Sequence, residues 1–397
     1  MLTLDKIYHA AYVLRQVARK TDLIAAPALA DDCELYLKTE NLQVTGSFKV
    51  RGAYYKISQL SEEEKAHGII ACSAGNHAQG VALAAARSGI ESVICMPDGA
   101  PISKVEATKA YGAKVELVKG AYDDAAARAQ QLQKEKGYTF IHPFDDDAVI
   151  AGQGTIGLEI LDQLADVDAV LVPVGGGGLV SGVAFAIKQL RPQCKVYGVQ
   201  AAAAPSMRDS VAAGEQITLD SVSTFADGIA VKHPGDITFK MVNEYVDGVV
   251  TVTEDEIAAA ILALIEKQKM IAEGAGAVAV AAVMFHKVEL AGKKVVALVS
   301  GGNIDVTILN RVITRGLVMS GRSATLVIAL EDKPGQLQGV SEIISRCGGN
   351  VVQVYHDHAD PNMAINSCYL RIGLETRDHA QVQQIRDELT AAGFKLV

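Results

Sequence analysis

The sequence predicts an α/β protein with a mostly parallel, buried sheet, followed by a smaller ferredoxin-like domain. Between about residues 34 and 300, short runs rich in Val and Ile alternate with longer Ala-rich helical patterns. Such runs are typical of strands in repeated βα units, because a parallel sheet covered on both faces presents no polar face to water. The expected strands are IIACS, SVICM, KVELV, YTFI, AVLVPV, KVYGV, GVVTV and KVVALVS.

Two of the helices between these strands have clear starting signals. Ser61 stands three residues before Glu64, and Thr253 stands three residues before Glu256. In this capping-box spacing, the hydroxyl and the carboxylate each accept a hydrogen bond from a backbone N–H group of the first turn. We therefore expect helices to begin just after Ser61 and just after Thr253.

A break in the pattern at residues 315–324, RGLVMSGRSA, predicts a domain boundary, because periodicity is lost among two glycines and two serines. We expect a larger domain at 1–318, with a smaller subdomain at roughly 47–148 inserted in it, a linker at 319–324 and a second domain at 325–397. In the second domain TLVIAL, NVVQVYHDH, MAINSCYLRIGLE and FKLV are predicted strands, and LQGVSEIISRC and HAQVQQIRDELTAAG are predicted helices. The order βαββαβ is the ferredoxin-like layout.

The composition of the chain indicates what kind of partner the protein binds and in which cellular compartment we expect it. The 397 residues carry a net charge of −9 with interspersed signs and no Trp, which argues against a nucleic-acid surface and favours a small-molecule partner. The longest uncharged apolar stretch, Ala275 to Phe285, is far shorter than the roughly 20 residues that cross a bilayer. The N-terminus shows no secretory signal pattern, and the six cysteines form no C-x-x-C pair, so we expect a cytoplasmic protein without disulfides or a zinc site.

Four consecutive glycines, Gly175 to Gly178, lie between the predicted strand VLVPV and the predicted helix LVSGVAFAIKQL. Without side chains, the backbone N–H groups of such a loop can converge on an anion at close range. The first helical turn adds its own unpaired donors and the positive end of the helix dipole. The sequence therefore predicts a phosphate site in this loop.

A second glycine pattern, GQGTIG at Gly152 to Gly157, matches the dinucleotide fingerprint G-x-G-x-x-G. That fingerprint must follow a strand and open a helix, whereas this one has helical sequence on both sides. Close packing of helices is therefore the favoured interpretation, and a nicotinamide cofactor is disfavoured.

Lys49 lies in the segment SFKVRGA between Phe48 and Val50. A lone lysine is usually a solvated surface charge. Apolar neighbours, however, disfavour the ammonium form, and a lysine with a lowered pKa can form an imine with an aldehyde cofactor.

Two further loops are rich in hydrogen-bond donors. SAGNHAQG, Ser73 to Gly80, joins the predicted strand IIAC to a helix, and its Asn76 amide and backbone N–H groups suit a carboxylate or phenolate oxygen. His77 in this loop has an equally good interpretation as a cap or core imidazole. SGGN, Ser300 to Asn303, ends the predicted strand KVVALV, at the edge where open α/β sheets bind ligands.

Taken together, the ordered motifs TGSFKVRGA, SAGNHAQG, GGGGL and SGGN resemble the β-family of pyridoxal-phosphate enzymes, also called fold type II or tryptophan-synthase-β-like. The resemblance is to the threonine (serine) dehydratases and covers residues 5 to 318. Residues 325–397 resemble one ACT domain, a module that binds amino acids or related effectors. The family likeness also implies a homodimer or homotetramer.

The resemblance implies specific roles for residues of these motifs. Lys49, beside Phe48, would form the Schiff base with pyridoxal 5′-phosphate, Asn76 would bond the phenolate oxygen of the ring, and Ser300 would face the pyridine nitrogen. The phosphate would lie on Gly175, Gly176, Gly177, Gly178 and Leu179, and the substrate on Ser73, Ala74, Gly75, Asn76 and His77. An effector would bind near the DKPG turn of the ACT domain, through Pro334, Gly335, Leu337 and Asn350, with Asp332 in the same turn.

The implied reaction is β-elimination, which would convert L-threonine to 2-oxobutanoate and ammonia, and L-serine to pyruvate. Lys49 would take the Cα proton, and the cofactor phosphate would protonate the leaving hydroxyl. An uncharged Ser300 would leave the pyridine nitrogen neutral, which favours elimination over racemisation. Ala74 stands where related serine racemases have a serine that acts as the acid on the second face, so racemisation should be minor.

The sequence also bears on whether the protein binds a cation. Several relatives hold a cation with an acidic residue where this chain has Gln200, followed by Ala204 and Ser206. No required divalent metal is therefore expected, although carbonyl oxygens could hold a monovalent cation.

Two other classes of protein compete with this interpretation: an amino-acid sensor with an inactive catalytic domain, and a cysteine or threonine synthase. The choice between isoleucine biosynthesis and threonine breakdown, the preference for threonine or serine, and the identity of the effector stay open.

Overall fold

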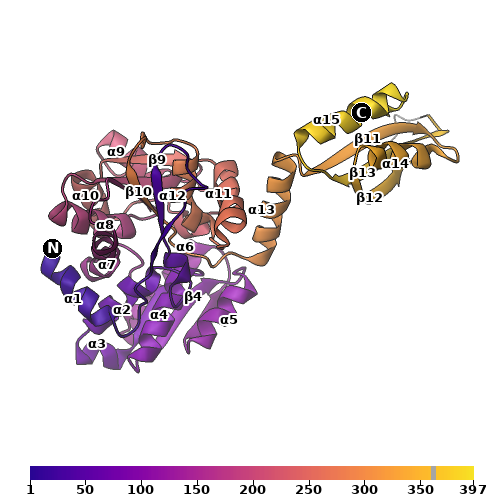
Figure 1. Ribbon diagram of the computed structural model, residues 1–397. Coiled ribbons are helices and arrows are strands. Elements are labelled where there is room, and N and C mark those ends of the chain that lie inside the picture. Colours follow the sequence, from indigo (N-terminus) through magenta and orange to yellow (C-terminus); the bar gives the residue numbers. More distant parts are fainter. Residues whose placement is uncertain (359–363) are drawn as a thin grey trace. The chain divides into compact units, whose positions relative to one another are not determined.

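The computed structural model describes residues 1–358 and 364–397, and the chain divides into two compact units, Met1–Ile308 and Leu309–Val397 (Figure 1). The division falls inside helix α13 (Val306–Met319), and β11 begins at Ser323. The segment RGLVM, which the sequence analysis placed in a boundary without periodicity, is therefore helical. A single glycine, Gly316, is tolerated inside a helix at a cost of about 1 kcal/mol.

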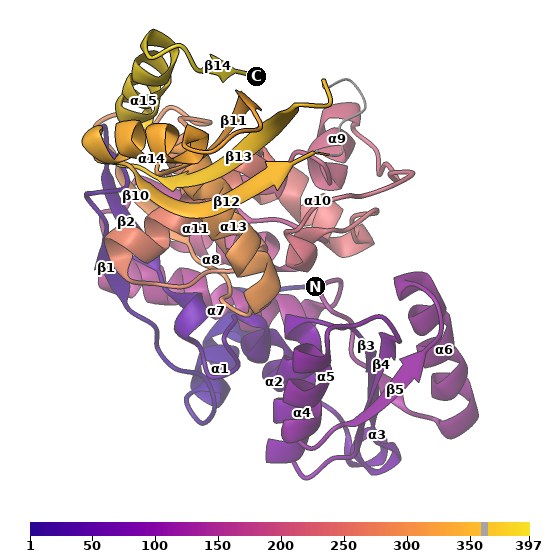
Figure 2. The same ribbon diagram turned by 90° about the vertical axis from the view of Figure 1, so that its right-hand side faces the viewer.

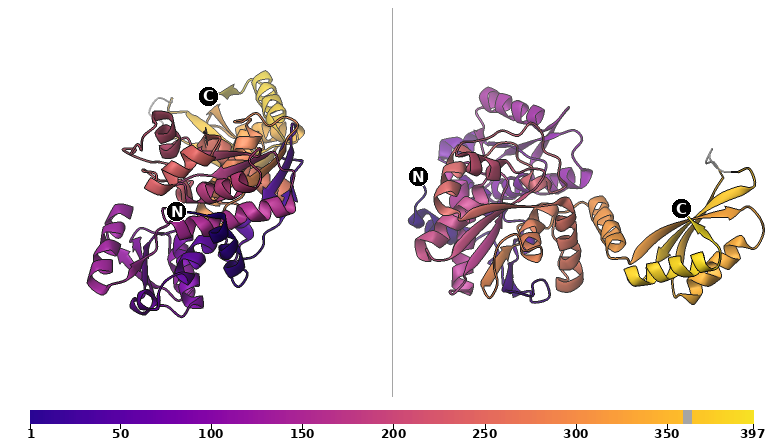
Figure 3. Two further views of the ribbon diagram at one scale, coloured as in Figure 1. Left: turned by 90° about the vertical axis from the view of Figure 1, so that its left-hand side faces the viewer. Right: turned by 90° about the horizontal axis from the view of Figure 1, so that it is seen from above.

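The larger unit contains a six-stranded sheet with strand order β1-β2-β10-β7-β8-β9. Its neighbouring strands are parallel, except that β1 pairs antiparallel with β2 at one edge. The strands are β1 (Leu23–Ala25), β2 (Glu34–Lys38), β7 (Ala169–Pro173), β8 (Lys195–Ala201), β9 (Gly248–Val252) and β10 (Lys294–Leu298). Every residue of β7, next to the middle of the sheet, is buried, as expected for a sheet with helices on both faces (Figure 3).

A second, four-stranded parallel sheet has the order β5-β4-β3-β6. Its strands are β3 (Ile69–Cys72), β4 (Ser92–Pro97), β5 (Lys114–Val118) and β6 (Thr139–Phe140). Helix α4 (Asn76–Arg87) packs on one face and α6 (Tyr122–Lys136) on the other (Figure 2). All eight strands expected from the Val- and Ile-rich runs are present, so the α/β prediction is confirmed.

The remaining helices of the larger unit connect and cover the two sheets. They are α1 (Leu4–Leu14), α2 (Lys49–Ser58), α3 (Glu62–His67), α5 (Ile102–Ala110), α7 (Asp147–Gln163), α8 (Gly178–Leu190), α9 (Ser206–Ala213), α10 (Asp236–Tyr245), α11 (Glu254–Gln268) and α12 (Gly274–Met284), with short 3-10 turns at Glu40–Leu42 and Asp227–Ile229. Capping boxes start α3 at Ser61 and α11 at Thr253, as predicted. Among the described residues, no helix combines the length and apolar character needed to cross a membrane.

The pattern GQGTIG lies in the middle of α7, which confirms the helical interpretation and removes the dinucleotide one. A Cβ added to Gly152 would lie 2.6 Å from the carbonyl oxygen of Arg51 in α2. A Cβ on Gly157 would lie 3.0 Å from the Cβ of Ala186 in α8. These glycines therefore let α7 approach two neighbouring helices closely.

The C-terminal unit is a four-stranded antiparallel sheet with the order β12-β13-β11-β14 and two helices on one face. Its elements after α13 are β11 (Ser323–Glu331), α14 (Gln336–Arg346), β12 (Asn350–Asp357), β13 (Ser367–Glu375), α15 (His379–Ala391) and β14 (Lys395–Leu396). This is the ferredoxin-like βαββαβ order that the sequence predicts. The start of the expected strand MAINSCYLRIGLE, at Met363, lies outside the described residues.

Candidate active site

Lys49 is the first residue of α2, and the segment before it is held against the end of β10. Ser47 forms an antiparallel bridge with Gly301, and the N–H of Phe48 donates to the carbonyl oxygen of Ser300 at 3.1 Å. The motifs TGSFKVRGA and SGGN, some 250 residues apart in sequence, are thereby adjacent.

The amine of Lys49 lies in a largely apolar environment. Its Nζ donates to the carbonyl oxygen of Pro143 at 2.7 Å and lies 5.4 Å from the centre of the Phe48 ring. Burial lowers the pKa of Lys49 to about 8, and the negative charge of Glu273 opposes this shift. A useful fraction of the side chain is therefore the free amine near neutral pH, as imine formation requires.

Arg51, on the same helix, anchors α2 from its buried side. Its guanidinium donates to both carboxylate oxygens of Glu40 at 2.8 Å and to those of Glu159 at 2.6 and 2.9 Å. Arg51 and Glu40 are at most 1% exposed, and Lys38 also pairs with Glu159 at 2.7 Å. Two bidentate contacts from one fork-shaped group fix the orientation of the helix that carries Lys49.

Asn76 is the first residue of α4 and belongs to a chain of polar side chains. Its Nδ2 donates to Oε1 of Glu273 at 2.6 Å, and its Oδ1 accepts from Nδ2 of Asn303 at 2.8 Å. The same amide of Asn303 donates to the carbonyl oxygen of Thr45 at 2.8 Å. The network therefore joins the SAGN loop, the SGGN turn and the residues before Lys49.

Glu273, which the sequence analysis did not single out, is the charged centre of this network. It is 4% exposed, directly precedes α12, and donates its backbone N–H to Gly301. Burial, and then the negative charge of Asp227, raise the pKa of Glu273 to about 7. A single carboxylate in the apolar run MIAEGAGAVAV, directly before a helix, was the sequence signal that could have identified it.

This buried carboxyl should give the cofactor-free protein a distinct dependence of stability on pH. The folded pKa of Glu273 lies above the ordinary 4.5, so the folded state binds this proton more tightly than the unfolded state. Its contribution is full below pH 4.5 and is lost as pH rises through about 7, a total change of about 3 kcal/mol. Urea unfolding of Glu273→Gln at several pH values should show a curve flatter by this amount. A difference from the unsubstituted chain that does not vary over this range would contradict the assignment.

The glycine loop lies between β7 and α8, and three of its positions have no room for a side chain. A Cβ on Gly176 would lie 2.4 Å from the ring of Phe144, and one on Gly178 would lie 2.7 Å from the carbonyl oxygen of the same residue. Gly177, which caps α8, has φ +97, a left-handed conformation that favours glycine.

The backbone donors of this loop are available. Among the described residues, the N–H groups of residues 175–180 donate no backbone or side-chain hydrogen bond, whereas the N–H of Ser181 begins the helical pattern by donating to Gly177. Several unpaired donors at the start of a 13-residue helix form a suitable cradle for a phosphate. Leu179, in the same turn, is 6% exposed.

The segment His142–Asp145 joins the lysine to the glycine loop. Pro143 accepts from Lys49, and Phe144 packs against Gly176 and Gly178. The segment is held in shape because Nδ1 of His142 accepts from the N–H groups of Phe144 and Asp145, at 3.2 and 2.7 Å. The Asp145 carboxylate in turn accepts three backbone N–H groups at the start of α10. The sequence analysis did not identify this segment.

The SAGN loop is partly exposed from Ser73 to Asn76, and the N–H of Gly75 donates to the hydroxyl of Ser73 at 3.1 Å. His77 is buried, with Nε2 2.9 Å from the carbonyl oxygen of Ile141. Burial, and then the charge of Lys49, lower the pKa of His77 to about 3. The imidazole is therefore neutral and donates to Ile141, which supports the core interpretation of this residue over a substrate contact.

Five other positions that the sequence pointed to are placed as follows. Ser300 is 3% exposed, and its hydroxyl lies 3.4 Å from the carbonyl oxygen of Ala275. Gln200 is buried and accepts from the N–H of Arg208 at 2.8 Å, while its Nε2 has no hydrogen-bond partner. In the C-terminal unit, Gly335 caps α14 with φ +92, Leu337 is 36% exposed, and Asn350 donates to Glu375 at 2.9 Å.

The residues that converge here fit pyridoxal phosphate. A desolvated amine suits its aldehyde, a ring of unpaired N–H groups suits its phosphate, and an amide side chain suits its phenolate oxygen. Because Gly176 and Gly178 pack directly against Phe144, backbone atoms rather than side chains line the phosphate cradle.

Comparison with known proteins agrees with this assignment. The pyridoxal-phosphate dependent enzyme family matches residues 14–301. L-threonine ammonia-lyase of Thermotoga maritima is 49% identical, over 100% of this chain and 99% of the relative. The structure of processed threonine deaminase isoform 2 from Solanum lycopersicum matches with TM-score 0.74 and 41% identity, over 78% of this chain and 88% of that one. The structure of maize serine racemase matches with TM-score 0.74 and 34% identity, over 80% and 98%.

The chain belongs to the pyridoxal-phosphate dependent enzyme family, and pyridoxal phosphate is its cofactor. Within that family it has the fold type II architecture, with two largely parallel sheets, followed by a ferredoxin-like domain.

Proposed function

We propose that this protein is a threonine ammonia-lyase that converts L-threonine to 2-oxobutanoate and ammonia, with L-serine as a secondary substrate. The observation that carries the proposal is the 49% identity, over the whole length of both chains, to an L-threonine ammonia-lyase. The arrangement of Lys49, Asn76 and the glycine loop supports it, because a chain that had become a sensor would have no need of a desolvated amine beside a phosphate cradle.

The proposed roles follow from the environment of each residue. Pyridoxal phosphate, when bound, supplies the electron sink that acidifies the Cα proton of the amino acid. Lys49, with its pKa lowered to about 8, is suited to remove that proton as a general base near neutral pH. The N–H groups of Gly175 to Gly178 hold the phosphate, and Asn76 orients the ring through its phenolate oxygen.

Glu273 and Ser300 set the electrostatics around the ring in this proposal. Asn76 connects Glu273 to the phenolate side of the ring, and the raised pKa of Glu273 lets its carboxyl hold a proton near pH 7. Ser300 would lie at the pyridine nitrogen, where its uncharged hydroxyl would leave that nitrogen neutral. The weaker electron sink that results would favour β-elimination over return of a proton to the other face of Cα.

A racemase is the competing function, because a serine racemase has a similar structure. Ala74 argues against racemase activity, because its methyl group has no acidic proton to donate to the second face of the substrate. Incubation with L-threonine alone should yield 2-oxobutanoate and ammonia, and incubation with L-serine should yield pyruvate in large excess over D-serine. A requirement for an added nucleophile would point to a synthase, and D-serine output comparable with pyruvate would point to a racemase.

The ACT-type domain is proposed to bind an amino-acid effector near the turn DKPG, where Pro334 and Gly335 precede α14, or near Asn350 at the start of β12. Effector binding can change turnover only if it favours one of two states of the enzyme. A comparison of the change in turnover caused by isoleucine or valine with the change caused by AMP would also distinguish a biosynthetic role from a catabolic one.

Removal of the second domain tests this regulatory role. A chain that lacks residues 325–397 should lose any response to isoleucine or valine and retain turnover of L-threonine. The domain has its own hydrophobic core, so its removal leaves the core clusters of the larger unit intact. A truncated enzyme that still responds would show that the effector binds elsewhere.

The six cysteines support a cytoplasmic location in this proposal. All are free thiols, and five of them are buried. Reduced thiols are the normal state in a reducing compartment.

A further inference from the structure

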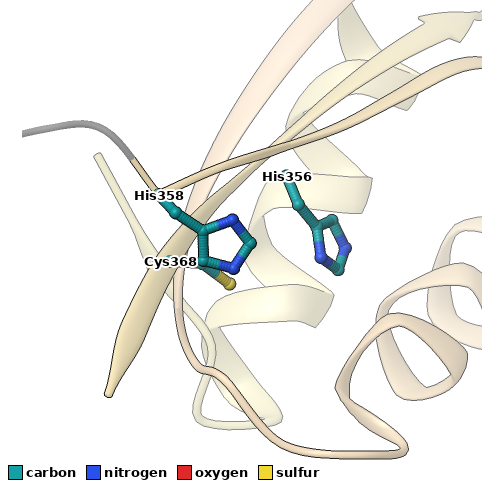
Figure 4. A group of neighbouring side chains, drawn as sticks. All are labelled: His356, His358 and Cys368. Carbon is teal, nitrogen blue, oxygen red and sulfur yellow. The ribbon is translucent and has the colours of Figure 1, made fainter. Parts of the chain in front are cut away.

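Two imidazoles and one thiol converge at one end of the β12–β13 pair (Figure 4). His356 lies in β12, and His358 directly follows the last residue of that strand, so the two side chains, two residues apart, face the same side of the sheet. The antiparallel register pairs His356 with Leu370 and Asp357 with Tyr369, so Cys368 comes opposite His358. One ring nitrogen of each histidine and the Cys368 sulfur lie within 4.8 Å of one another.

A carboxylate lies beside this group and contacts one of its histidines. Oδ2 of Asp332 lies 3.3 Å from Nε2 of His358, and the negative charge of Asp332 adds to burial in raising the pKa of Cys368. Asp332 is held at this place because its N–H donates to the carbonyl oxygen of Asn366 at 2.9 Å, directly before β13. Four candidate ligands therefore come from three segments of the domain.

We propose that His356, His358 and Cys368 form a binding site for Zn²⁺ or a similar thiophilic divalent ion in the ACT-type domain, with Asp332 as a fourth ligand or as the hydrogen-bond partner of His358. Two imidazoles and a thiolate are typical zinc ligands, whereas Mg²⁺ and Ca²⁺ take oxygen ligands. A carboxylate on the second nitrogen of a ligand histidine fixes the tautomer and the orientation of its ring.

The geometry needs only a small contraction to become a metal site. Zinc distances of about 2.0–2.1 Å to nitrogen and 2.3 Å to sulfur place tetrahedral ligand atoms roughly 3.3–3.8 Å apart. The present limit of 4.8 Å is roughly 1.0–1.5 Å longer. The two histidines are exposed and can rotate, while Cys368, at 2% exposure, supplies a fixed point.

Within the described ranges 1–358 and 364–397, no second group of three His, Cys, Asp or Glu side chains meets the same distance. The proposed site is separate from the position around Gln200, where the sequence analysis expected no required divalent ion. The lack of a C-x-x-C pair in the sequence argues against a zinc site formed by one short motif, but the ligands here come from the β12–β13 pair and a turn.

Zinc binding by the full-length holoenzyme tests the proposal. After removal of metals, equilibrium dialysis against buffered Zn²⁺, with bound metal counted by atomic absorption, should give one ion per chain. His356→Ala, His358→Ala and Cys368→Ser should each weaken binding more than about 100-fold. Asp332→Asn should weaken binding about 10- to 100-fold if it acts through His358.

Matched variants separate this site from adventitious binding. Cys347→Ser removes another buried thiol of the same domain, and His67→Ala removes an exposed histidine of the larger unit; both should bind zinc like the unsubstituted chain. With Co²⁺, a thiolate charge-transfer band should appear in the difference spectrum and be absent from Cys368→Ser. Should Cys368→Ser fail to fold, the two exposed histidines still decide the question. Zinc uptake that is unchanged in both histidine variants, or no uptake by the unsubstituted chain at micromolar free zinc, would overturn the proposal.

Discussion

Replacing Lys49 by alanine is expected to reduce the turnover of L-threonine by at least about 10⁴-fold, because the variant loses both the amine that bonds the cofactor and the base that takes the Cα proton. The visible absorption of the reconstituted protein should disappear with it. Production of 2-oxobutanoate and the absorption spectrum measure the two losses separately. The effect arises at the site itself, because Lys49 bonds a backbone carbonyl and forms no ion pair with any residue that the structure describes, so α2 should stay folded.

Lys65→Ala is the matched control for this experiment. Lys65 is on the neighbouring helix α3 and pairs with Glu62, one turn away, so its loss should leave both activity and colour unchanged. A Lys49→Ala protein that is folded by circular dichroism and retains the visible band would show that a different lysine carries the cofactor.

Gly176→Ala is expected to weaken the binding of pyridoxal phosphate by about 10- to 100-fold, as measured by titration of the cofactor-free protein. The added Cβ would lie 2.4 Å from the Phe144 ring, so either the ring or the loop must move. Overpacking of this kind costs about 1–3 kcal/mol, and each 1.4 kcal/mol is tenfold in affinity. Movement of the loop would also misdirect the N–H groups that hold the phosphate.

Gly99→Ala provides the comparison, because a Cβ at Gly99 meets nothing within 4 Å and its φ is not positive. That variant should bind the cofactor normally. The double variant Gly176→Ala/Phe144→Ala should bind the cofactor more tightly than the two separate losses predict if the ring is the obstacle. Unchanged affinity in Gly176→Ala would mean that the phosphate lies elsewhere.

Much of the fold was predictable because its signals are local. The Val- and Ile-rich strands such as β7 are buried on both faces, so they appear as continuous apolar runs. Capping residues such as Ser61 and Thr253 act within one turn of the helix that they start. The error at α13 also has a local cause, since glycine and serine reduce helical periodicity in RGLVMSGRSA without ending the helix at Gly316.

Residues of the candidate site could be predicted only where neighbours in the sequence are enough to indicate their role. Lys49 and the four glycines are recognisable from their immediate neighbours. Glu273 was missed because its importance depends on Asn76, which is 197 residues away. Pro143 and Phe144 were missed for the same reason, since only the tertiary fold brings their carbonyl and ring to Lys49 and to Gly176.

The proposed metal site is a further case of long-range assembly. The spacing of His356 and His358 is visible in the sequence, but Cys368 joins them only through the β12–β13 register. The position of Asp332 depends on its backbone bond to Asn366. Strand pairing of this kind follows from the complete ferredoxin-like topology.

Borohydride reduction of the holoenzyme, followed by proteolysis and mass spectrometry, tests most directly whether Lys49 carries the cofactor. Reduction makes the link between the lysine and pyridoxal phosphate permanent, so the modified peptide reports its position. We expect the modification on the peptide that contains Lys49, and on no other lysine in stoichiometric amount. A stoichiometric label on another lysine, or none on a protein that turns over L-threonine, would contradict the account.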